Sequence, residues 1–254
     1  IVTPRSFNSR ITRNTSLTSR GASPMEGSSR RMKLHPVINA RPTASICCSP
    51  PLRDAETAEA LWRAGAEEAF LEVAGANVAA FQAAGVSRVV VTSPHCLTTF
   101  KQEYGELEGD FEALHQTQLF HQLITEQRLV PRNELNKKVV YHDPCTLGRV
   151  NRIYDEPREV LKAIPGLELL EIPHFNHDNS LCCGGGSGGV WLERPKGERL
   201  SDVRVQQAVD TGADILAVAC PYCRQMFEVS VGTMGVDIEV RDISELLAES
   251  IQTN

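Results

Sequence analysis

The stretch that most constrains the fold of this chain runs from Leu181 to Gly189 and reads LCCGGGSGG. Five of the six residues that follow Cys183 are glycine. A backbone this rich in glycine favours neither a helix nor a strand, and two adjacent cysteines pack poorly in a hydrophobic core. We therefore expect a loop in which the backbone and two sulfur atoms crowd around something bound.

The overall composition is that of an ordinary globular protein. The chain has 254 residues, a net charge of −6 and a pI of about 5.7. That length allows one large domain or two of ordinary size. The acidic balance gives no general reason to expect a nucleic-acid partner. No apolar run approaches the roughly 20 residues that span a bilayer.

Residues 1–40 differ from the remainder of the sequence. They are rich in Arg, Ser and Asn, hold Glu26 as their single acidic residue, and show no hydrophobic periodicity. Such a segment buries too little apolar surface to offset the entropy of ordering. We predict that residues 1–40 are disordered or a non-native extension.

Beyond residue 53 the sequence alternates between helical and strand patterns. This alternation predicts an α/β fold with parallel strands and helices flanking both faces. A long helical pattern covers residues 54–85, and we expect a break near Gly75. Strands are expected at 88–92, 111–116, 138–142, 167–172, 214–219 and 238–241, and helices at 94–104, 118–128, 156–164, 200–211, 221–229 and 244–251, the last with Ser244 as a possible cap.

The two halves of this pattern repeat each other. Three pairs of segments match in the same order: 46–48 with 181–183, 89–96 with 217–223, and 111–115 with 238–242. Self-similarity of this kind indicates two copies of one unit. We predict an incomplete first module at residues 41–130 and a complete second module at residues 138–254.

The second module carries five cysteines in a regular spacing. Cys145 is followed by 36 residues, then Cys182 and Cys183, then 36 residues, then Cys220 and Cys223. Cys145 and Cys220 follow predicted strands, whose carboxyl ends share one edge of a parallel sheet. Thiolates are soft ligands for iron–sulfur clusters and zinc. Five exceed the four of a tetrahedral zinc site, although zinc with one spare cysteine stays open.

This cysteine pattern resembles the cysteine-rich CCG domain, a family that includes a cysteine-rich component of heterodisulfide reductase and the iron–sulfur subunits of glycerol-3-phosphate and lactate dehydrogenases. The resemblance covers about residues 44–250. The motifs HDPC at 142–145, YDEPR at 154–158 and NSLCCGGG at 179–186 look closest to the branch that serves electron transfer flavoprotein or acyl-CoA oxidation.

The resemblance implies a non-cubane 4Fe–4S cluster held by all five cysteines. It also implies an oxidoreductase component that passes electrons between a flavoprotein and a quinone or disulfide acceptor. Its partners would be that flavoprotein and further iron–sulfur or membrane subunits. We accordingly expect a cytoplasmic protein, peripheral at the inner face of the membrane through partner subunits.

The first module departs from the family pattern. Ser93 stands where the second module has Cys220, and only Cys47, Cys48 and Cys96 remain, with His95 beside the last. We expect no cluster there, and either a vacant site or a weak zinc site. The alternative function is a zinc-stabilised module that binds partners and carries no electrons.

Two further features receive structural interpretations. His142 and Asp143 precede Cys145 and could relay protons beside a redox centre, but we favour a structural role in which Asp143 caps a turn at the end of a strand. Trp191 and Leu192 are expected to anchor a helix to the core, as large apolar residues generally do.

Overall fold

The computed structural model describes residues 44–46, 50–109, 111–186, 189–192 and 194–251. Residues 1–40, for which we predicted a disordered or non-native extension, lie outside these ranges, as do Cys47 and Cys48. All described residues belong to one compact unit, residues 40–254. None of the helices in the described ranges has the length and apolar character needed to cross a membrane.

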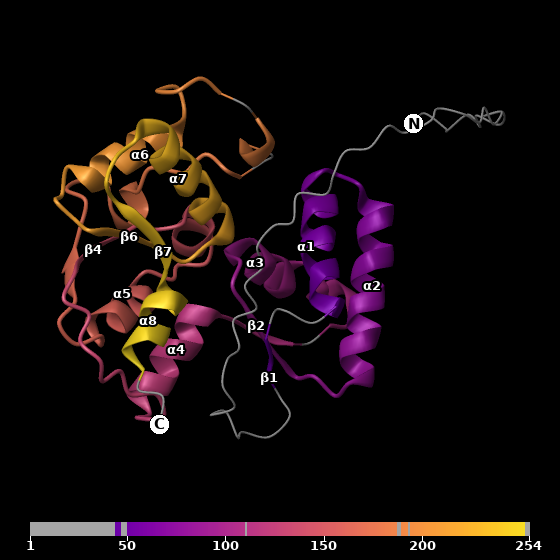
Figure 1. The fold of residues 1–254 in the computed structure, drawn as a ribbon. Coiled ribbons are helices and arrows are strands. Elements are labelled where there is room, and N and C mark those ends of the chain that lie inside the picture. The colour runs from indigo at the N-terminus through magenta and orange to yellow at the C-terminus, as the bar shows by residue number, and fades with distance from the viewer. Residues whose placement is uncertain (1–43, 47–49, 110, 187–188, 193, 252–254) are drawn as a thin grey trace, which may run out of the picture. The chain divides into compact units, whose positions relative to one another are not determined.

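Strands and helices alternate along the described chain, as Figure 1 shows. The strands are β1 (Ala44–Ile46), β2 (Arg88–Val91), β3 (Glu112–His115), β4 (Lys138–Tyr141), β5 (Glu168–Leu170), β6 (Ile215–Val218) and β7 (Glu239–Asp242). The α-helices are α1 (Pro50–Arg63), α2 (Glu67–Ala83), α3 (Pro94–Gln102), α4 (Gln116–Thr125), α5 (Asp155–Lys162), α6 (Leu200–Val209), α7 (Pro221–Met234) and α8 (Ile243–Ser250). Short turns of helix are η1 (Tyr104–Leu107), η2 (Thr146–Val150, a π-helix), η3 (His177–Asn179) and η4 (Gly189–Trp191).

The strands form two separate sheets. The first has the order β1-β2-β3 and the second the order β5-β4-β6-β7, and every pair in both is parallel. This confirms the predicted α/β class with flanking helices. One sheet falls within residues 41–130 and the other within 138–254; the module boundaries themselves stay predictions.

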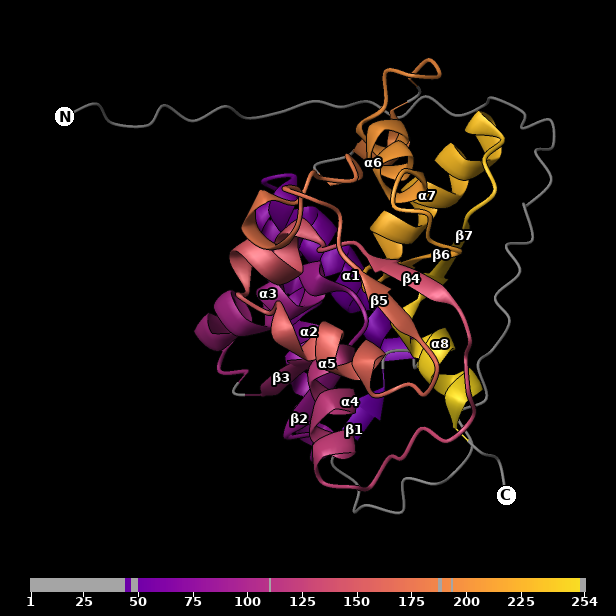
Figure 2. The same ribbon diagram turned by 90° about the vertical axis from the view of Figure 1, so that its left-hand side faces the viewer.

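The second sheet is covered on both faces, as its fully buried strands require. Alternate residues of a strand point to opposite faces. Thus Ile215 and Ala217 of β6 pack in a core with α5 and α8, whereas Leu216 and Val218 pack in a second core with α6 and α7. Figures 1 and 2 show these two helix pairs on either side of the strands.

The first of these cores also includes residues of the first sheet and its helices. Helix α4, which follows β3, packs against α5 and α8 of the second half. Gln116 at the start of α4 donates to Asp242 at the start of α8, with 3.0 Å between Nε2 and Oδ1. The two halves are therefore joined by apolar and polar contacts within one unit.

Two local predictions were wrong. The break in the long helical pattern lies at Gly65, which has a φ of +72°, and Gly75 lies inside α2. A positive φ ends a helix, whereas a helix that is packed on a core tolerates an interior glycine. The cap of α8 is Asp242, not Ser244: its carboxylate accepts from the Ser244 N–H at 2.9 Å.

Candidate functional site

Two neighbouring strands deliver cysteines to the same edge of the second sheet. Strands β4 and β6 pair with Tyr141 opposite Ala217, and both end within two residues of that point. Cys145 follows β4 and leads into the π-helix η2. Cys220 follows β6 as the N-cap of α7, with Pro221 in the first helical position and Cys223 in the first turn. The predicted meeting of strand ends is therefore present.

The five sulfurs form a succession of neighbouring pairs, which we call the sulfur row. The Sγ atoms of Cys182 and Cys145 are 3.8 Å apart. Cys183 is within hydrogen-bonding reach of both Cys182 and Cys223, and Cys223 is within reach of Cys220. Three of the five cysteines are almost fully buried, and Cys145 and Cys182 at one end of the row are partly exposed. The row therefore opens to solvent at one end.

Backbone N–H groups of the glycine tract point at these sulfurs. Gly184 N lies 3.3 Å from Cys182 Sγ, and Gly185 N lies 3.4 Å from Cys183 Sγ. Gly184 has a φ of +80°, and a Cβ at Gly185 would stand 2.9 Å from Cγ of Met226. Glycine is needed at both positions, first for the backbone conformation and then for the close approach. The crowded loop predicted from the sequence is present.

The site favours negative charge on part of this row. Hydrogen bonding to Cys182 and Cys223 lowers the pKa of Cys183 to about 5. Hydrogen bonding to Cys223 lowers the pKa of Cys220 to about 6. The N-terminus of α7 adds the backbone N–H of Cys223, which hydrogen-bonds to Cys220, and the positive end of the helix dipole. Hydrogen bonding to Cys182 raises the pKa of Cys145 above its usual value. Hydrogen bonding within the row thus favours the thiolate form at Cys183 and Cys220 and the thiol form at Cys145.

A row differs from the arrangement that encloses one metal ion. Within the ranges that the structure describes, no group of three or more His, Cys, Asp or Glu side chains is arranged to hold a single ion. What the row offers is five soft donors, backbone N–H groups that donate to sulfur and an adjoining glycine tract. Those are the features by which a protein holds and tunes an iron–sulfur cluster. The residues present therefore fit such a group.

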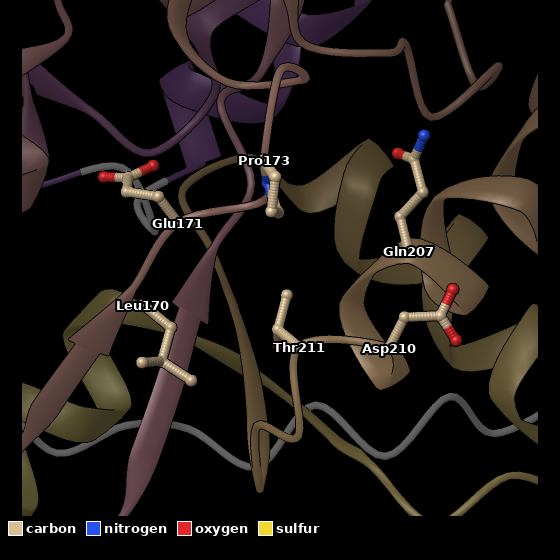
Figure 3. Close-up of a pocket in the computed structure, with 6 residues that line it drawn as sticks. All are labelled: Leu170, Glu171, Pro173, Gln207, Asp210 and Thr211. Carbon is tan, nitrogen blue, oxygen red and sulfur yellow. The ribbon is translucent and has the colours of Figure 1, made fainter.

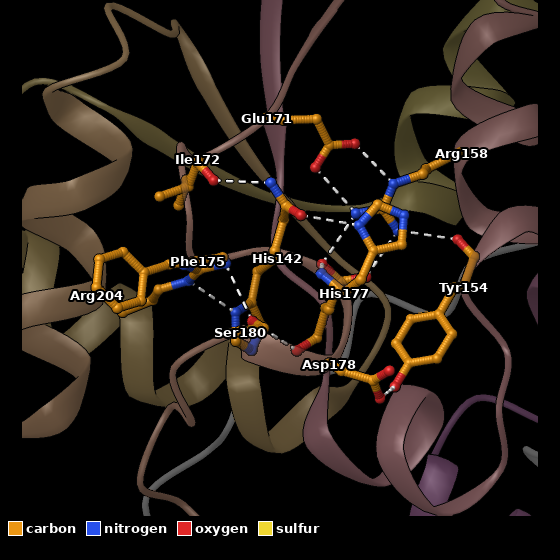
Figure 4. Close-up of polar contacts among 12 residues, drawn as sticks. His142, Tyr154, Arg158, Glu171, Ile172, Phe175, His177, Asp178, Ser180 and Arg204 are labelled. Carbon is orange, nitrogen blue, oxygen red and sulfur yellow. Dashed lines mark hydrogen bonds and ion pairs between the residues drawn. The ribbon is translucent and has the colours of Figure 1, made fainter.

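A buried ion pair holds the strand end that leads to Cys145. Arg158 of α5 donates to both carboxylate oxygens of Asp143, at 2.7 and 2.9 Å, and also to Glu171. Asp143 Oδ2 accepts from the backbone N–H of His177 at 2.9 Å. Asp143 thus ties the β4 end to the segment that leads into the cysteine loop. Figure 4 shows this network around Arg158.

A second buried arginine supports the same loop from α6. Arg204 donates to Nδ1 of His142, to Oγ of Ser180 and to the carbonyl of Phe175 (Figure 4). Burial lowers the pKa of Arg204 to about 10, so the side chain stays charged at neutral pH. Burial, with the charge of Arg204, holds the pKa of His142 well below its usual range. His142 is therefore a neutral acceptor, which matches its structural interpretation.

One residue of the first half reaches the row. His95, in the first turn of α3, has its Nε2 3.2 Å from Oγ1 of Thr146 and its ring edge-on to Tyr222. Burial lowers the pKa of His95, but the adjacent Cys220 outweighs burial and raises it. From the sequence, His95 was a possible zinc ligand with the first-module cysteines or a cap of its own turn. No local pattern indicated its contact with the second module.

Of the three first-module cysteines, the structure describes Cys96 alone. Cys96 is buried in the hydrophobic core beside the first sheet. Cys47 and Cys48 lie outside the described residues, so the predicted weak site at Cys47, Cys48 and Cys96 stays a prediction.

The prediction for Trp191 and Leu192 was wrong. Their side chains are 82% and 58% exposed, so they anchor no helix to the core.

A separate hollow of about 280 Å³ opens between β5 and α6, and Figure 3 shows the residues around it. They are Leu170, Glu171, Pro173, Gln207, Asp210 and Thr211. None of these is a cysteine, so the hollow does not coincide with the sulfur row.

Comparison with known proteins gives a family match over both halves. The model of the CCG cysteine-rich domain matches residues 40–101 and 139–228. The chain is 35% identical to a probable iron–sulfur-binding oxidoreductase, FadF, of Bacillus subtilis, over 74% of this chain and 27% of that protein. It is 31% identical to an EtfAB:quinone oxidoreductase of Syntrophomonas wolfei, over 83% of this chain and 29% of that protein.

A third relative comes from Methanosarcina acetivorans. It is a component of the dihydromethanophenazine:CoB–CoM heterodisulfide reductase and is 35% identical, over 71% of this chain and 44% of that protein. The chain thus spans less than half the length of each of these three relatives. A solved structure of an aspartate racemase homologue from Pyrococcus horikoshii covers 72% of this chain and 74% of that one with a TM-score of 0.31 and 12% identity, a likeness too low to support any inference.

Proposed function

This chain belongs to the family of the cysteine-rich CCG domain, and from that premise we propose that it is an iron–sulfur component of an oxidoreductase. The single observation that supports this most strongly is the row of five sulfurs at the carboxyl edge of the second sheet. Two of the relatives are named as an iron–sulfur-binding oxidoreductase and a heterodisulfide reductase component. The chain would carry electrons through one cluster.

The ligands in this proposal are Cys145, Cys182, Cys183, Cys220 and Cys223. When bound, an iron–sulfur cluster supplies reversible one-electron transfer. Five thiolates exceed the four that an ordinary cubane uses, so we propose the non-cubane 4Fe–4S type. The glycine N–H groups and the α7 N-terminus would stabilise the negative charge of the thiolates. The chain's own contribution is to fix these donors and to bury three of the cysteines away from water.

The buried arginines would hold the ligand loops before the cluster is bound. Arg158 and Arg204 converge from opposite helices on Asp143 and Ser180, which lie two residues before Cys145 and Cys182. Since both contacts are buried, they resist competition from water. The two ligand segments would therefore keep their spacing during electron transfer.

The proposed partners are a flavoprotein that donates electrons and a quinone or disulfide acceptor reached through other subunits. One relative is named an EtfAB:quinone oxidoreductase and another belongs to a heterodisulfide reductase. We propose a cytoplasmic place of action, at the inner face of the membrane through such subunits; a reducing compartment keeps ligand thiols free. Within the chain, residues 138–254 would form the complete cluster module and residues 41–130 the incomplete one.

Metal analysis of anaerobically purified or reconstituted protein tests the proposal. We expect about four iron and four sulfide per chain, a visible charge-transfer band and an EPR signal in one redox state. Zinc in place of iron, with no colour and no redox signal, would support the non-redox scaffold instead. Absence of both metals after reconstitution would rule out both functions.

A second experiment tests the electron-transfer role. A reduced electron transfer flavoprotein is mixed anaerobically with the iron-loaded chain, and the cluster absorption is followed. Rapid bleaching of the cluster band is expected for a physiological class of donor. A loaded cluster that dithionite reduces but no flavoprotein reduces would contradict the proposed partner and leave the cluster intact.

A further inference from the structure

His95 belongs by sequence to the first half of the chain, yet its side chain meets the second. It lies in the first turn of α3, which follows β2. Its Nε2 is 3.2 Å from Oγ1 of Thr146, the residue next to Cys145. Its ring packs edge-on to Tyr222, with 5.1 Å between ring centroids, and Tyr222 lies between Cys220 and Cys223 in sequence. The imidazole therefore contacts Thr146, next to Cys145 at one end of the sulfur row, and Tyr222, next to Cys223 near the other end.

The backbone that carries His95 is itself fixed against the second half. Helix α3 packs on the π-helix η2. Asn151, which ends η2, donates to Oγ1 of Thr98 in α3 at 2.8 Å. A Cβ on Gly186 would come within 4.0 Å of His95 Nε2. The imidazole thus stands between η2 and the glycine tract, and its place does not depend on the single contact with Thr146.

The surroundings of the ring indicate which nitrogen carries hydrogen. Nδ1 is buried and has no hydrogen-bond partner of acceptable geometry among the described residues, although Cys220 lies close to the ring. A hydrogen on Nδ1 would be a buried unpaired donor, which is costly. With hydrogen on Nε2, the ring donates to Oγ1 of Thr146. The hydroxyl of Thr146 is then free to donate its own hydrogen to Sγ of Cys145, which lies 3.8 Å away.

We propose that His95 is a positioning residue for the iron–sulfur cluster, which orients the Thr146 hydroxyl as a donor to the sulfur of Cys145. This inference rests on the proposed function, because it assumes that Cys145 holds the cluster. Hydrogen bonds to cluster sulfurs stabilise the more negative, reduced state and raise the reduction potential. The first module, which lacks a full set of ligands, thereby contributes to the cluster of the second.

The main test is a redox titration of the iron-loaded chain, followed by EPR. His95→Phe keeps a ring but removes the donor. At a fixed solution potential, the ratio of reduced to oxidised cluster should fall about fivefold, the factor that corresponds to roughly one hydrogen bond. His95→Gln restores an N–H donor and should return the ratio toward the wild-type value. His121→Phe, on α4, is the matched loss of a histidine and should leave the ratio unchanged.

A coupled test uses Thr146. Thr146→Val keeps the shape and removes the hydroxyl, so it should lower the ratio as His95→Phe does. Because both changes act on the same hydrogen bond, the double variant should shift the ratio no further than either single variant. Additive shifts would overturn the route through Thr146. If His95→Phe does not retain iron, Thr146→Val makes the same test with the imidazole still in place.

The outcomes separate this inference from the proposed function. Wild-type protein that takes up no iron overturns both. Iron-loaded wild type, together with an iron-loaded His95→Phe variant of unchanged midpoint potential, overturns the role of His95 alone. A change in folding stability without a change in potential would assign His95 a purely structural role and would also overturn the inference.

Discussion

The two strand-to-helix corners after β2 and β6 share one backbone design and differ in chemistry. In each, an extended residue precedes a helix that begins with proline: Ser93 before α3 and Cys220 before α7. The third helical residue is a cysteine in both, Cys96 and Cys223. One Cys-to-Ser difference at the N-cap therefore leaves the corner intact but removes a sulfur. The fold of such a corner does not depend on its ligands.

The corners before α4 and α8, the next in each half, also share a backbone design and differ in the side chain that caps the helix. His115 caps α4 and forms a reciprocal capping box with Gln118, and Asp242 caps α8 and forms the same box with Glu245. An imidazole and a carboxylate thus satisfy equivalent backbone N–H groups. Burial shifts the pKa values of the two caps in opposite directions: it lowers that of His115 to about 4 and raises that of Asp242.

The interiors of the two halves are stabilised differently. The first half packs a run of aromatic rings, with Phe100 and Tyr104 at 4.6 Å and Phe81 and Phe111 at 5.4 Å between centroids. The second half instead buries two charged arginines beside the cysteine loops. Aromatic packing needs no polar partners, whereas buried charges hold loops in fixed positions and must be stripped of water. The second half therefore carries a desolvation penalty at its site that the aromatic packing of the first half avoids.

The largest expected effect is on iron content, which should distinguish Cys223 from Cys96, the cysteines at equivalent positions of the two corners. Cys223→Ser removes a proposed ligand, and we expect iron content to fall by half or more and the EPR signal to be lost or altered. Cys96→Ser, at the equivalent position of the first corner, should retain full iron. The measurement is iron and sulfide per chain after identical anaerobic reconstitution. Equal loss of iron in both variants would show that Cys96 also contributes to metal binding.

Replacing Arg158 removes the kind of buried charge that distinguishes the second half. Arg158→Met leaves the buried carboxylate of Asp143 without its partner, and the free energy of unfolding should fall by about 3–5 kcal/mol. Lys162→Met removes a solvent-exposed pair with Glu159 on the same helix and should cost less than about 1 kcal/mol. Urea unfolding of the metal-free chain measures both. Similar values for the two variants would mean that the buried network adds no stability.

The unlike caps should give the two halves unlike pH dependence. His115 has a folded-state pKa of about 4, against roughly 6.5 when unfolded. Between these values the unfolded chain binds the proton and the native chain does not. The free energy of unfolding therefore falls as the pH drops from about 6.5 to about 4, by roughly 3 kcal/mol.

His115→Asn keeps a capping side chain and removes the titration. Urea unfolding at a series of pH values should show a smaller slope for this variant over the same window. A slope equal to that of the wild type would mean that His115 is protonated in the native state. Any slope that remains in the variant belongs to other groups, among them His142, whose pKa is also lowered by burial.

Much of the fold was predictable because hydrophobic runs and turn residues mark its elements. The strands and their parallel arrangement follow from short apolar runs that alternate with amphipathic segments. The error at Gly75 has a physical cause, since packing on a core outweighs the modest cost of one glycine in a helix. The error at Ser244 reflects a competition between nearby caps that Asp242 wins with a carboxylate.

The sequence allowed us to predict that cysteines meet at one edge of the second sheet. It did not allow us to predict the side chains that hold the cysteine loops in place. Strand ends locate Cys145 and Cys220 because topology alone fixes that edge. Arg158 and Arg204 occupy helix positions at which charged residues are ordinarily exposed, and only the packed structure reveals their burial. The contact of His95 depends on how α3 packs on η2, which no local pattern encodes. Long-range packing is thus where the sequence is least informative.

The smallest expected effects come from two glycines whose replacement by alanine should change the free energy of unfolding in opposite directions. Gly184, which follows the paired cysteines, has a φ of +80°, and its Cβ would meet Cβ of Leu200 at 3.3 Å. Gly184→Ala should lower the free energy of unfolding by about 1–2 kcal/mol. Gly75 lies within α2 with open space where a Cβ would stand. Gly75→Ala should raise the free energy of unfolding by about 0.5–1 kcal/mol.

Urea unfolding of the metal-free chain measures the change in the free energy of unfolding for both variants. Iron uptake then shows whether each change also affects the proposed metal site. Gly75→Ala should bind iron as the wild type does, because α2 carries none of the proposed ligands. Gly184→Ala should bind less, because its N–H is directed at Cys182 Sγ by the positive φ that alanine disfavours. Equal iron uptake by the two variants, with the stability changes as expected, would show that the cysteines adopt their row without the glycine backbone, and the loop would then be a consequence of the ligands.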